Sequence, residues 1–206
     1  MRLYVDIQLI SPYAMCAFVA LTEKRLAFDL QTVDLAGGAQ HGPEYAKASL
    51  THRVPTLVDG DFALAESSAI VEYLDEAYPR TPRLFPTELR ARAKARQIQA
   101  WLRSDFVPIR QDRNTQVVFH RPVAQPLSAA AQASADKLFA AATDLLAHGR
   151  DCLFGDWSIA DVDLALMLNR LVLNGDEVPG ELVRYAARQW ARPSVQSWVR
   201  LKRPSV

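Results

Sequence analysis

Three prolines between residues 79 and 86 separate two parts of the sequence that differ in hydrophobic pattern. Before these prolines, short alternating apolar runs that suit strands are interleaved with helical stretches. From residue 88 onward the pattern is helical. A chain of 206 residues exceeds one average domain. The sequence therefore predicts two domains, residues 1–79 and 88–206, joined by a linker at 80–87.

The two parts also differ in net charge. Residues 1–80 contain six Lys or Arg and eleven Asp or Glu, whereas the rest of the chain contains eighteen and twelve. The whole chain has a formal net charge of only +1, which argues against a general nucleic-acid-binding protein.

Cysteine content and hydropathy limit the cellular compartments in which we expect the protein to reside. Cys16 and Cys152 lie far apart without CxxC spacing, so we expect neither a disulfide framework nor a metal site. Such a chain suits the reducing cytoplasm. Arg2 and Asp6 interrupt the first apolar stretch, which argues against a signal peptide. No apolar run is long enough for a membrane span.

The first part has the element order of a thioredoxin-like α/β domain. Pro12 suits the first turn of a helix, and Asp59-Gly60 predicts a hairpin turn. Strands are predicted at 2–7, 28–33, 55–58 and 62–65, with helices at 12–24, 43–48 and 66–77.

The second part is predicted to be an all-α domain. Its first helix is expected to run from residue 89 to about 112, with a kink at Pro108. A loop at 120–126 follows, and further helices are expected at 128–147, 159–173, 180–190 and 193–201.

Ser11 lies between the first strand and the first helix. A hydroxyl there is close to free backbone N–H groups and to the positive end of the helix dipole. This environment favours an anion such as a thiolate. The alternative is a purely structural helix N-cap.

Two further turns could bind a peptide-like ligand. If the Val54–Pro55 bond is cis, the backbone of Val54 can pair with an extended peptide; the alternative is an ordinary edge-strand proline. Glu66 and Ser67 begin a helix and could hold an ammonium group and a carboxylate, or could simply cap the helix.

Ser158 and Asp161 begin the most apolar helix and match a variant capping box. We expect this pair to matter for folding and not for chemistry.

The combination of these features resembles the cytosolic glutathione transferases over nearly the whole chain. SPYAMCAFVALTEK resembles the first helix of the serine-type tau and zeta classes. RVPTLVDGDFALAESSAIVEYLDEAYP resembles the glutathione-site hairpin and third helix, and GDWSIADVDLAL resembles the capping-box helix. ARAKARQIQAWLRSDFVPIR and LNRLVLNGDEVPG resemble a bacterial subgroup typified by the YfcF protein.

The resemblance implies a role for each matching residue. Ser11 would be catalytic and would donate a hydrogen bond to the sulfur of glutathione, favouring the nucleophilic thiolate. Val54 and Pro55 would meet the cysteinyl backbone, while Glu66 and Ser67 would hold the γ-glutamyl group. Candidates for the glycyl carboxylate are Gln40, His41 and Arg53.

The second substrate, a small hydrophobic electrophile or a hydroperoxide, is expected between the domains. The candidate side chains for binding this second substrate are Tyr13, Trp101, Arg103, Phe106 and Arg110. The arginines suit a solvated face or a dimer contact equally well.

The resemblance implies a cytoplasmic, homodimeric glutathione transferase that also reduces organic hydroperoxides under oxidative stress. It uses glutathione as co-substrate and needs no metal, nucleic acid or membrane. One alternative is a maleylacetoacetate isomerase-like enzyme; this is weakened because Leu9-Ile10-Ser11-Pro12 stands where the zeta class has a Ser-Ser-Cys run. The other is a non-catalytic glutathione-binding protein.

Overall fold

A computed structural model describes residues 1–204, which form two compact units. The first unit contains residues 1–84 together with the described residues from 193 onward, and the second contains Phe85–Arg192.

The first unit is built on a four-stranded mixed sheet with the order β2-β1-β3-β4. β1 is parallel to β2 and antiparallel to β3, and β3 and β4 form a hairpin. This confirms the predicted thioredoxin-like arrangement. Its strands are β1 (Arg2–Asp6), β2 (Asp29–Val33), β3 (Thr56–Asp59) and β4 (Phe62–Ala65).

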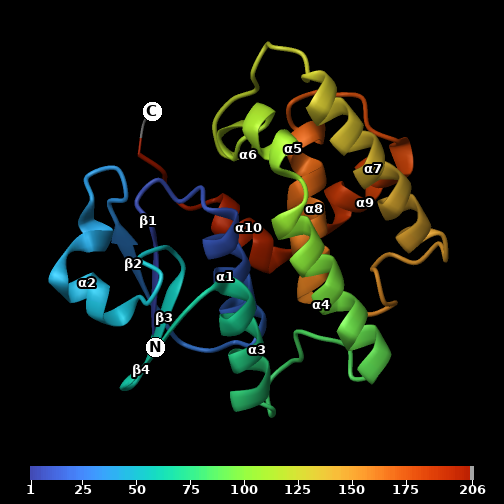
Figure 1. Cartoon of the computed structure of the whole chain (residues 1–206). Coiled ribbons are helices and arrows are strands. Elements are labelled where there is room, and N and C mark those ends of the chain that lie inside the picture. The colour runs from blue at the N-terminus through green and yellow to red at the C-terminus, as the bar shows by residue number, and fades with distance from the viewer. Residues whose placement is uncertain (205–206) are drawn as a thin grey trace. The chain divides into compact units, whose positions relative to one another are not determined.

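Helices cover both faces of this sheet (Figure 1). The α1 and α3 helices pack together on one face. On the other face, Tyr45 of α2 makes an edge-on ring contact with Tyr4 of β1 at 5.3 Å between ring centroids. The helices of this unit are α1 (Pro12–Glu23), the short 3-10 helix η1 (Ala39–His41), α2 (Pro43–Ala48), α3 (Ser67–Ala77) and α10 (Pro193–Val199).

The core of the first unit follows the predicted alternation. Leu3 and Val5 on β1 are fully buried, as are Ile70 and Leu74 on α3. The hairpin turn consists of Gly60 and Asp61, one residue later than predicted. Gly60 has φ +61°, a conformation that glycine adopts without steric cost.

The α10 helix belongs to this first unit, although the sequence suggested the helical domain. It packs on α1. The Trp198 ring is fully buried, and its centroid lies 5.2 Å from that of Phe18. Sequence periodicity identifies the apolar face of a short helix but not the surface that the face will cover.

The second unit is predominantly helical, as predicted, and its described residues add one isolated β-bridge between Phe154 and Asp156. Its elements are α4 (Leu89–Ser104), α5 (Val107–Asp112), α6 (Gln116–Phe119), α7 (Ala129–Leu146), α8 (Ile159–Val172) and α9 (Gly180–Trp190). The α8 helix is buried along most of its length.

The predicted single helix at 89–112 was wrong, because the chain forms two helices. The α4 helix ends at Ser104, and Phe106 has a non-helical backbone with φ −83° and ψ 43°. Pro108 then lies within the first turn of α5, where its missing N–H costs no helical hydrogen bond. The proline therefore begins a new helix and does not kink an existing one.

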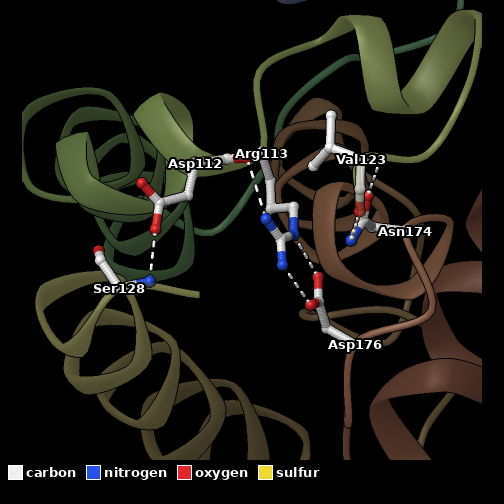
Figure 2. Close-up of polar contacts among 6 residues, drawn as sticks. All are labelled: Asp112, Arg113, Val123, Ser128, Asn174 and Asp176. Atoms are coloured by element: carbon white, nitrogen blue, oxygen red, sulfur yellow. Dashed lines mark hydrogen bonds and ion pairs between the residues drawn. The ribbon is translucent and has the colours of Figure 1, made fainter. Parts of the chain in front are cut away.

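A polar cluster in the second unit holds the segment between α5 and α7 (Figure 2). Arg113 donates two hydrogen bonds of 2.7 Å to the carboxylate of Asp176. Asn174 accepts from the backbone N–H of Val123 at 2.8 Å and donates to its carbonyl at 3.4 Å. Asn174 and Asp176 both belong to the LNRLVLNGDEVPG stretch, so in this unit that stretch fastens a neighbouring segment.

Candidate functional site

One edge of the sheet gathers the turns that the sequence singled out. β1 ends at Asp6 beside the end of β2 at Val33. β3 begins at Thr56, which pairs both with Ala65 at the end of β4 and with Tyr4 of β1. The segments that follow β1, β2 and β4 therefore emerge at the same edge as the segment that precedes β3.

A pocket of about 750 Å³ opens at this edge within the first unit. Its volume lies in the range of small-molecule sites. The segments after β1 and β2 and the segment before β3 form its walls. The predicted site residues that line it are Ser11, Gln40, His41, Arg53 and Val54.

Ser11 is both the N-cap of α1 and part of the pocket wall. Its Oγ accepts a hydrogen bond of 3.2 Å from the backbone N–H of Ala14. A hydroxyl group has two lone pairs and one proton, and this cap uses only a lone pair. The structural and chemical interpretations of Ser11 are therefore compatible, because the O–H remains available as a donor.

Asp6 is a buried carboxylate bonded to the backbone N–H of Ser11, and it was not predicted from the sequence as a site residue. It is only 6% exposed and lines the pocket. Its two oxygens accept from the backbone N–H groups of Ile10, at 2.9 Å, and of Ser11, at 3.0 Å. The only sequence signal was an acidic residue at the end of an apolar strand.

The Val54–Pro55 peptide bond is cis, so the condition for pairing with an extended peptide is met. The carbonyl of the preceding residue, Arg53, accepts from the hydroxyl groups of Tyr45 at 2.7 Å and Thr56 at 3.2 Å. A third hydroxyl, that of Ser49, also donates to this carbonyl at 3.2 Å. These contacts fix the segment that carries Val54 into the pocket wall.

Three buried oxygen atoms of pocket residues have no hydrogen-bond partner within residues 1–204. They are Oε1 of Gln8, Oε1 of Gln40 and Oγ1 of Thr51. Buried acceptors without a partner are costly in a folded protein. An N–H or O–H donor that reached them would satisfy them.

Two histidines lie side by side in the pocket wall. The ring centroids of His41 and His52 are 5.6 Å apart in a stacked arrangement, and Nδ1 of His52 lies 3.1 Å from the carbonyl oxygen of Gln40. His52 is in a loop, and it also lines the pocket. With Arg53, the imidazoles provide groups that suit a carboxylate.

Glu66 and Ser67 lie at the same sheet edge, immediately after β4, but they are not among the residues that line the pocket. Glu66 occupies the N-cap position of α3 with φ +71°, but its side chain makes no capping hydrogen bond. Ser67 is 3% exposed. Tyr13 lies in α1 and does not line the pocket either.

The remaining candidates belong to the second unit and have partners within it. Arg103 pairs with Asp163 at 3.2 Å, and Arg110 donates to the carbonyl of Leu102 at 3.0 Å.

The two aromatic candidates lie edge to face in the same unit. The centroids of Trp101 and Phe106 are 4.6 Å apart. Trp101 lines a separate groove of about 260 Å³ beside α4 and α7. Phe106 is fully buried, so its ring offers no exposed surface to a ligand in this arrangement.

Residues 1–204 contain no cluster of three or more His, Cys, Asp or Glu side chains arranged to hold a metal ion. None of the helices in this part of the chain is long and apolar enough to cross a membrane.

Two family models match the chain, and the second of them extends beyond the second unit to include α10. Residues 8–82 match the model described as glutathione S-transferase, N-terminal domain, and residues 88–203 match the corresponding C-terminal domain.

Individual relatives agree with these matches. Mouse glutathione S-transferase theta-3 is 34% identical over 101 residues, which is 49% of this chain and 41% of that protein. A probable maleylacetoacetate isomerase from Vibrio cholerae is 37% identical over 93 residues, which is 44% of this chain and 43% of that protein. The matched segments thus span about two-fifths of these curated relatives.

Solved structures match over more of the chain. A glutathione transferase homolog from Burkholderia GL BGR1, solved with bound glutathione, is 48% identical. The match has a TM-score of 0.78 and covers 96% of this chain and 95% of that one. A theta class glutathione S-transferase from Xanthomonas axonopodis pv. citri, also with glutathione bound, is 27% identical with a TM-score of 0.77, over 98% and 97% of the two chains.

Proposed function

The chain belongs to the glutathione S-transferase family, and on this basis we propose that it binds glutathione in the 750 Å³ pocket and transfers it to an electrophile. The observation that carries the proposal is the hydroxyl of Ser11, whose proton is not used by the N-cap. Bound glutathione supplies the nucleophilic sulfur.

Each part of this tripeptide has a counterpart in the chain. The hydroxyl of Ser11 donates a hydrogen bond to the sulfur and so favours the thiolate over the thiol. The backbone of Val54 pairs with the cysteinyl unit. Gln40, His41 and Arg53 are the groups offered to the glycyl carboxylate, and the pocket imidazole of His52 joins them. Glu66 and Ser67, at the same sheet edge, hold the γ-glutamyl group.

The fit of such a ligand is supported by the unpaired acceptors of the pocket. Gln8, Gln40 and Thr51 each have a buried oxygen without a partner in residues 1–204, and the ligand has ammonium and amide N–H groups. Its carboxylates suit the imidazoles and the guanidinium of the pocket wall.

The serine variant Ser11→Ala tests the proposal. We expect kcat for an aryl halide and for an organic hydroperoxide to fall on the order of 10²-fold, since one donor to a developing anion is lost. We expect the Kd for glutathione to change much less. Steady-state kinetics and calorimetric binding are the measurements.

Loss of the N-cap alone costs about 1 kcal/mol, so a matched control is needed. Ser128 caps α7 with the same 3.2 Å contact, from its Oγ to the N–H of Ala131, in the other unit. Ser128→Ala should therefore lose similar stability and keep its turnover. Unchanged turnover in Ser11→Ala with binding intact would assign the sulfur contact to another group.

A glutathione-dependent isomerase is the second candidate, because the Vibrio cholerae relative is a probable maleylacetoacetate isomerase. An isomerase regenerates glutathione in every turnover, whereas a transferase consumes it. Thiol consumption per product formed separates the two. Retention on immobilised glutathione without any turnover would indicate a binding protein instead. The electrophile, the peroxidase activity and the homodimer stay predictions.

A further inference from the structure

The segment that follows α10 returns to the loop that carries Ser11 (Figure 1). Nε of Arg203 donates a hydrogen bond of 3.2 Å to the carbonyl of Leu9. Leu9 is two residues before Ser11, is 7% exposed and has φ +54°, a conformation that a leucine rarely adopts. The loop therefore depends on contacts from outside itself.

The other donors of Arg203 bind the end of α10. Nη1 donates to the carbonyls of Val199, at 2.7 Å, and Leu201, at 3.1 Å, and Nη2 donates to that of Trp198 at 3.2 Å. Carbonyls in the last turn of a helix lack intrahelical N–H partners. The N–H of Leu201 bonds the carbonyl of Trp198 at 3.1 Å, and the guanidinium supplies further donors to the carbonyls of Trp198 and Val199. Because Trp198 is fully buried, we expect this end of α10 to hold the Arg203 side chain in a fixed position.

Asp6 holds the same loop through different backbone groups. Its carboxylate accepts the N–H groups of Ile10 and Ser11, whereas Arg203 binds the carbonyl of Leu9. Burial lowers the pKa of Arg203, and the negative charge of Asp6 acts against that change. The two charges therefore interact across the loop.

The charge of Asp6 has a consequence for any anion at Ser11. A buried carboxylate close to a developing thiolate disfavours it by like-charge repulsion. The guanidinium of Arg203, which is bound to the same loop, offsets that field, and its charge persists throughout the physiological pH range.

We propose that Arg203 is a positioning residue for the pocket, which fixes Ser11 through the carbonyl of Leu9 and offsets the charge of Asp6. The part concerning the bound sulfur rests on the proposed function; the part concerning the loop does not.

The role of Arg203 in positioning the loop is tested on the ligand-free protein by amide hydrogen exchange. In Arg203→Gln we expect the N–H groups of Ile10 and Ser11 to exchange at least about 10-fold faster, because a partly opened loop exposes them. The matched control is Arg200→Gln, an exposed arginine of the same segment. Equal protection in Arg203→Gln and in the wild type would overturn the positioning role.

The effect of the Arg203 charge on the bound sulfur is tested by measuring the ultraviolet absorbance of the glutathione thiolate as a function of pH. We expect the pKa of the glutathione thiol to rise by about 1 in Arg203→Gln and to stay near the wild-type value in Arg203→Lys, which keeps the charge. A purely structural role would not separate these variants. The other titratable or charged groups that line the pocket are present in every variant and serve as the common background: Asp6, Asp34, His41, His52 and Arg53.

The two proposals can fail separately. If the wild type binds no glutathione, the proposed function is wrong, and the exchange experiment still decides the role of Arg203 in the loop. If the wild type binds and turns over while Arg203→Gln matches it in exchange and in thiol pKa, the inference about Arg203 is wrong and the proposed function stands.

Discussion

The buried carboxylate of Asp161 organises the start of α8. It accepts hydrogen bonds from the N–H of Leu153 at 2.8 Å, the N–H of Ser158 at 2.9 Å, the hydroxyl of Ser158 at 3.0 Å and the hydroxyl of Tyr185 at 2.8 Å. The predicted capping box is thus confirmed, with two partners that local sequence did not indicate. Burial raises the pKa of Asp161, although its hydrogen bonds act in the opposite direction.

This direction predicts how stability depends on pH. A carboxyl whose pKa is higher in the folded state stabilises the fold below its unfolded pKa of about 3.9, and this contribution is lost as pH rises through the folded pKa. Asparagine does not titrate. The difference in unfolding free energy between the wild type and Asp161→Asn should therefore be largest in acid and decrease toward neutral pH, as measured by urea denaturation.

The exposed Asp144→Asn is the control for this comparison and should give a difference that changes little with pH. A difference for Asp161→Asn that widens toward neutral pH would contradict the prediction. It would mean that the hydrogen bonds lower the pKa of Asp161 by more than burial raises it.

Among the elements, α1 and α3 are joined by a buried ion pair. The side chain of Lys24 is fully buried, and its Nζ lies 3.2 Å from Oδ1 of Asp75 and 3.2 Å from the carbonyl oxygen of Pro82. Oδ1 of Asp75 also accepts the N–H of Leu84 at 2.8 Å. One carboxylate therefore fastens the end of α1 and the chain that leaves α3.

Removing only one partner should be strongly destabilising, because it leaves a buried charge unpaired. We expect Asp75→Ala to lower the free energy of unfolding by about 3–5 kcal/mol. The double variant Lys24→Met/Asp75→Ala should recover a large part of this loss in denaturant titrations. If the double variant is no more stable than Asp75→Ala, the ion pair is not the cause.

For the whole molecule, the chain order does not match the spatial grouping. Residues 1–84 form a compact unit with the helix that begins at Pro193, although 108 residues of the other unit, Phe85–Arg192, lie between them in the sequence. The hydroxyl of Ser194 donates to Glu23 at the end of α1. The last helix is therefore a structural part of the unit that carries the pocket.

Replacing the buried ring of this helix should destabilise the first unit. We expect Trp198→Ala to cost about 3–5 kcal/mol, as for large buried aromatic residues in general. Hydrogen exchange should accelerate in β1 and α1. The exposed Ser197→Ala is the control and should change stability by less than about 0.5 kcal/mol. Acceleration confined to α8 and α9 would contradict this assignment.

Local patterns in the sequence determined the elements and several of their ends. Alternation and helical periodicity identified the strands and most helices, because the spacing of buried apolar residues differs between the two kinds of element. Short-range chemistry likewise identified the hairpin, the α8 capping box and the N-cap position of Ser11, since each involves residues a few positions apart. The prediction of one continuous helix through Pro108 was wrong, because a proline is compatible both with a kink and with the first turn of a new helix.

Tertiary structure decided which distant residues meet. Local sequence assigned neither Asp6 nor Arg203 to the site. Asp6 reaches the pocket because the sheet register brings the strand ends to one edge, and Arg203 reaches the loop before Ser11 because α10 packs on α1. The proline-rich segment suggested two successive domains, but the burial of Trp198 places the end of the chain with its beginning. Such contacts depend on the whole fold, because their energy exists only after the separate elements have packed.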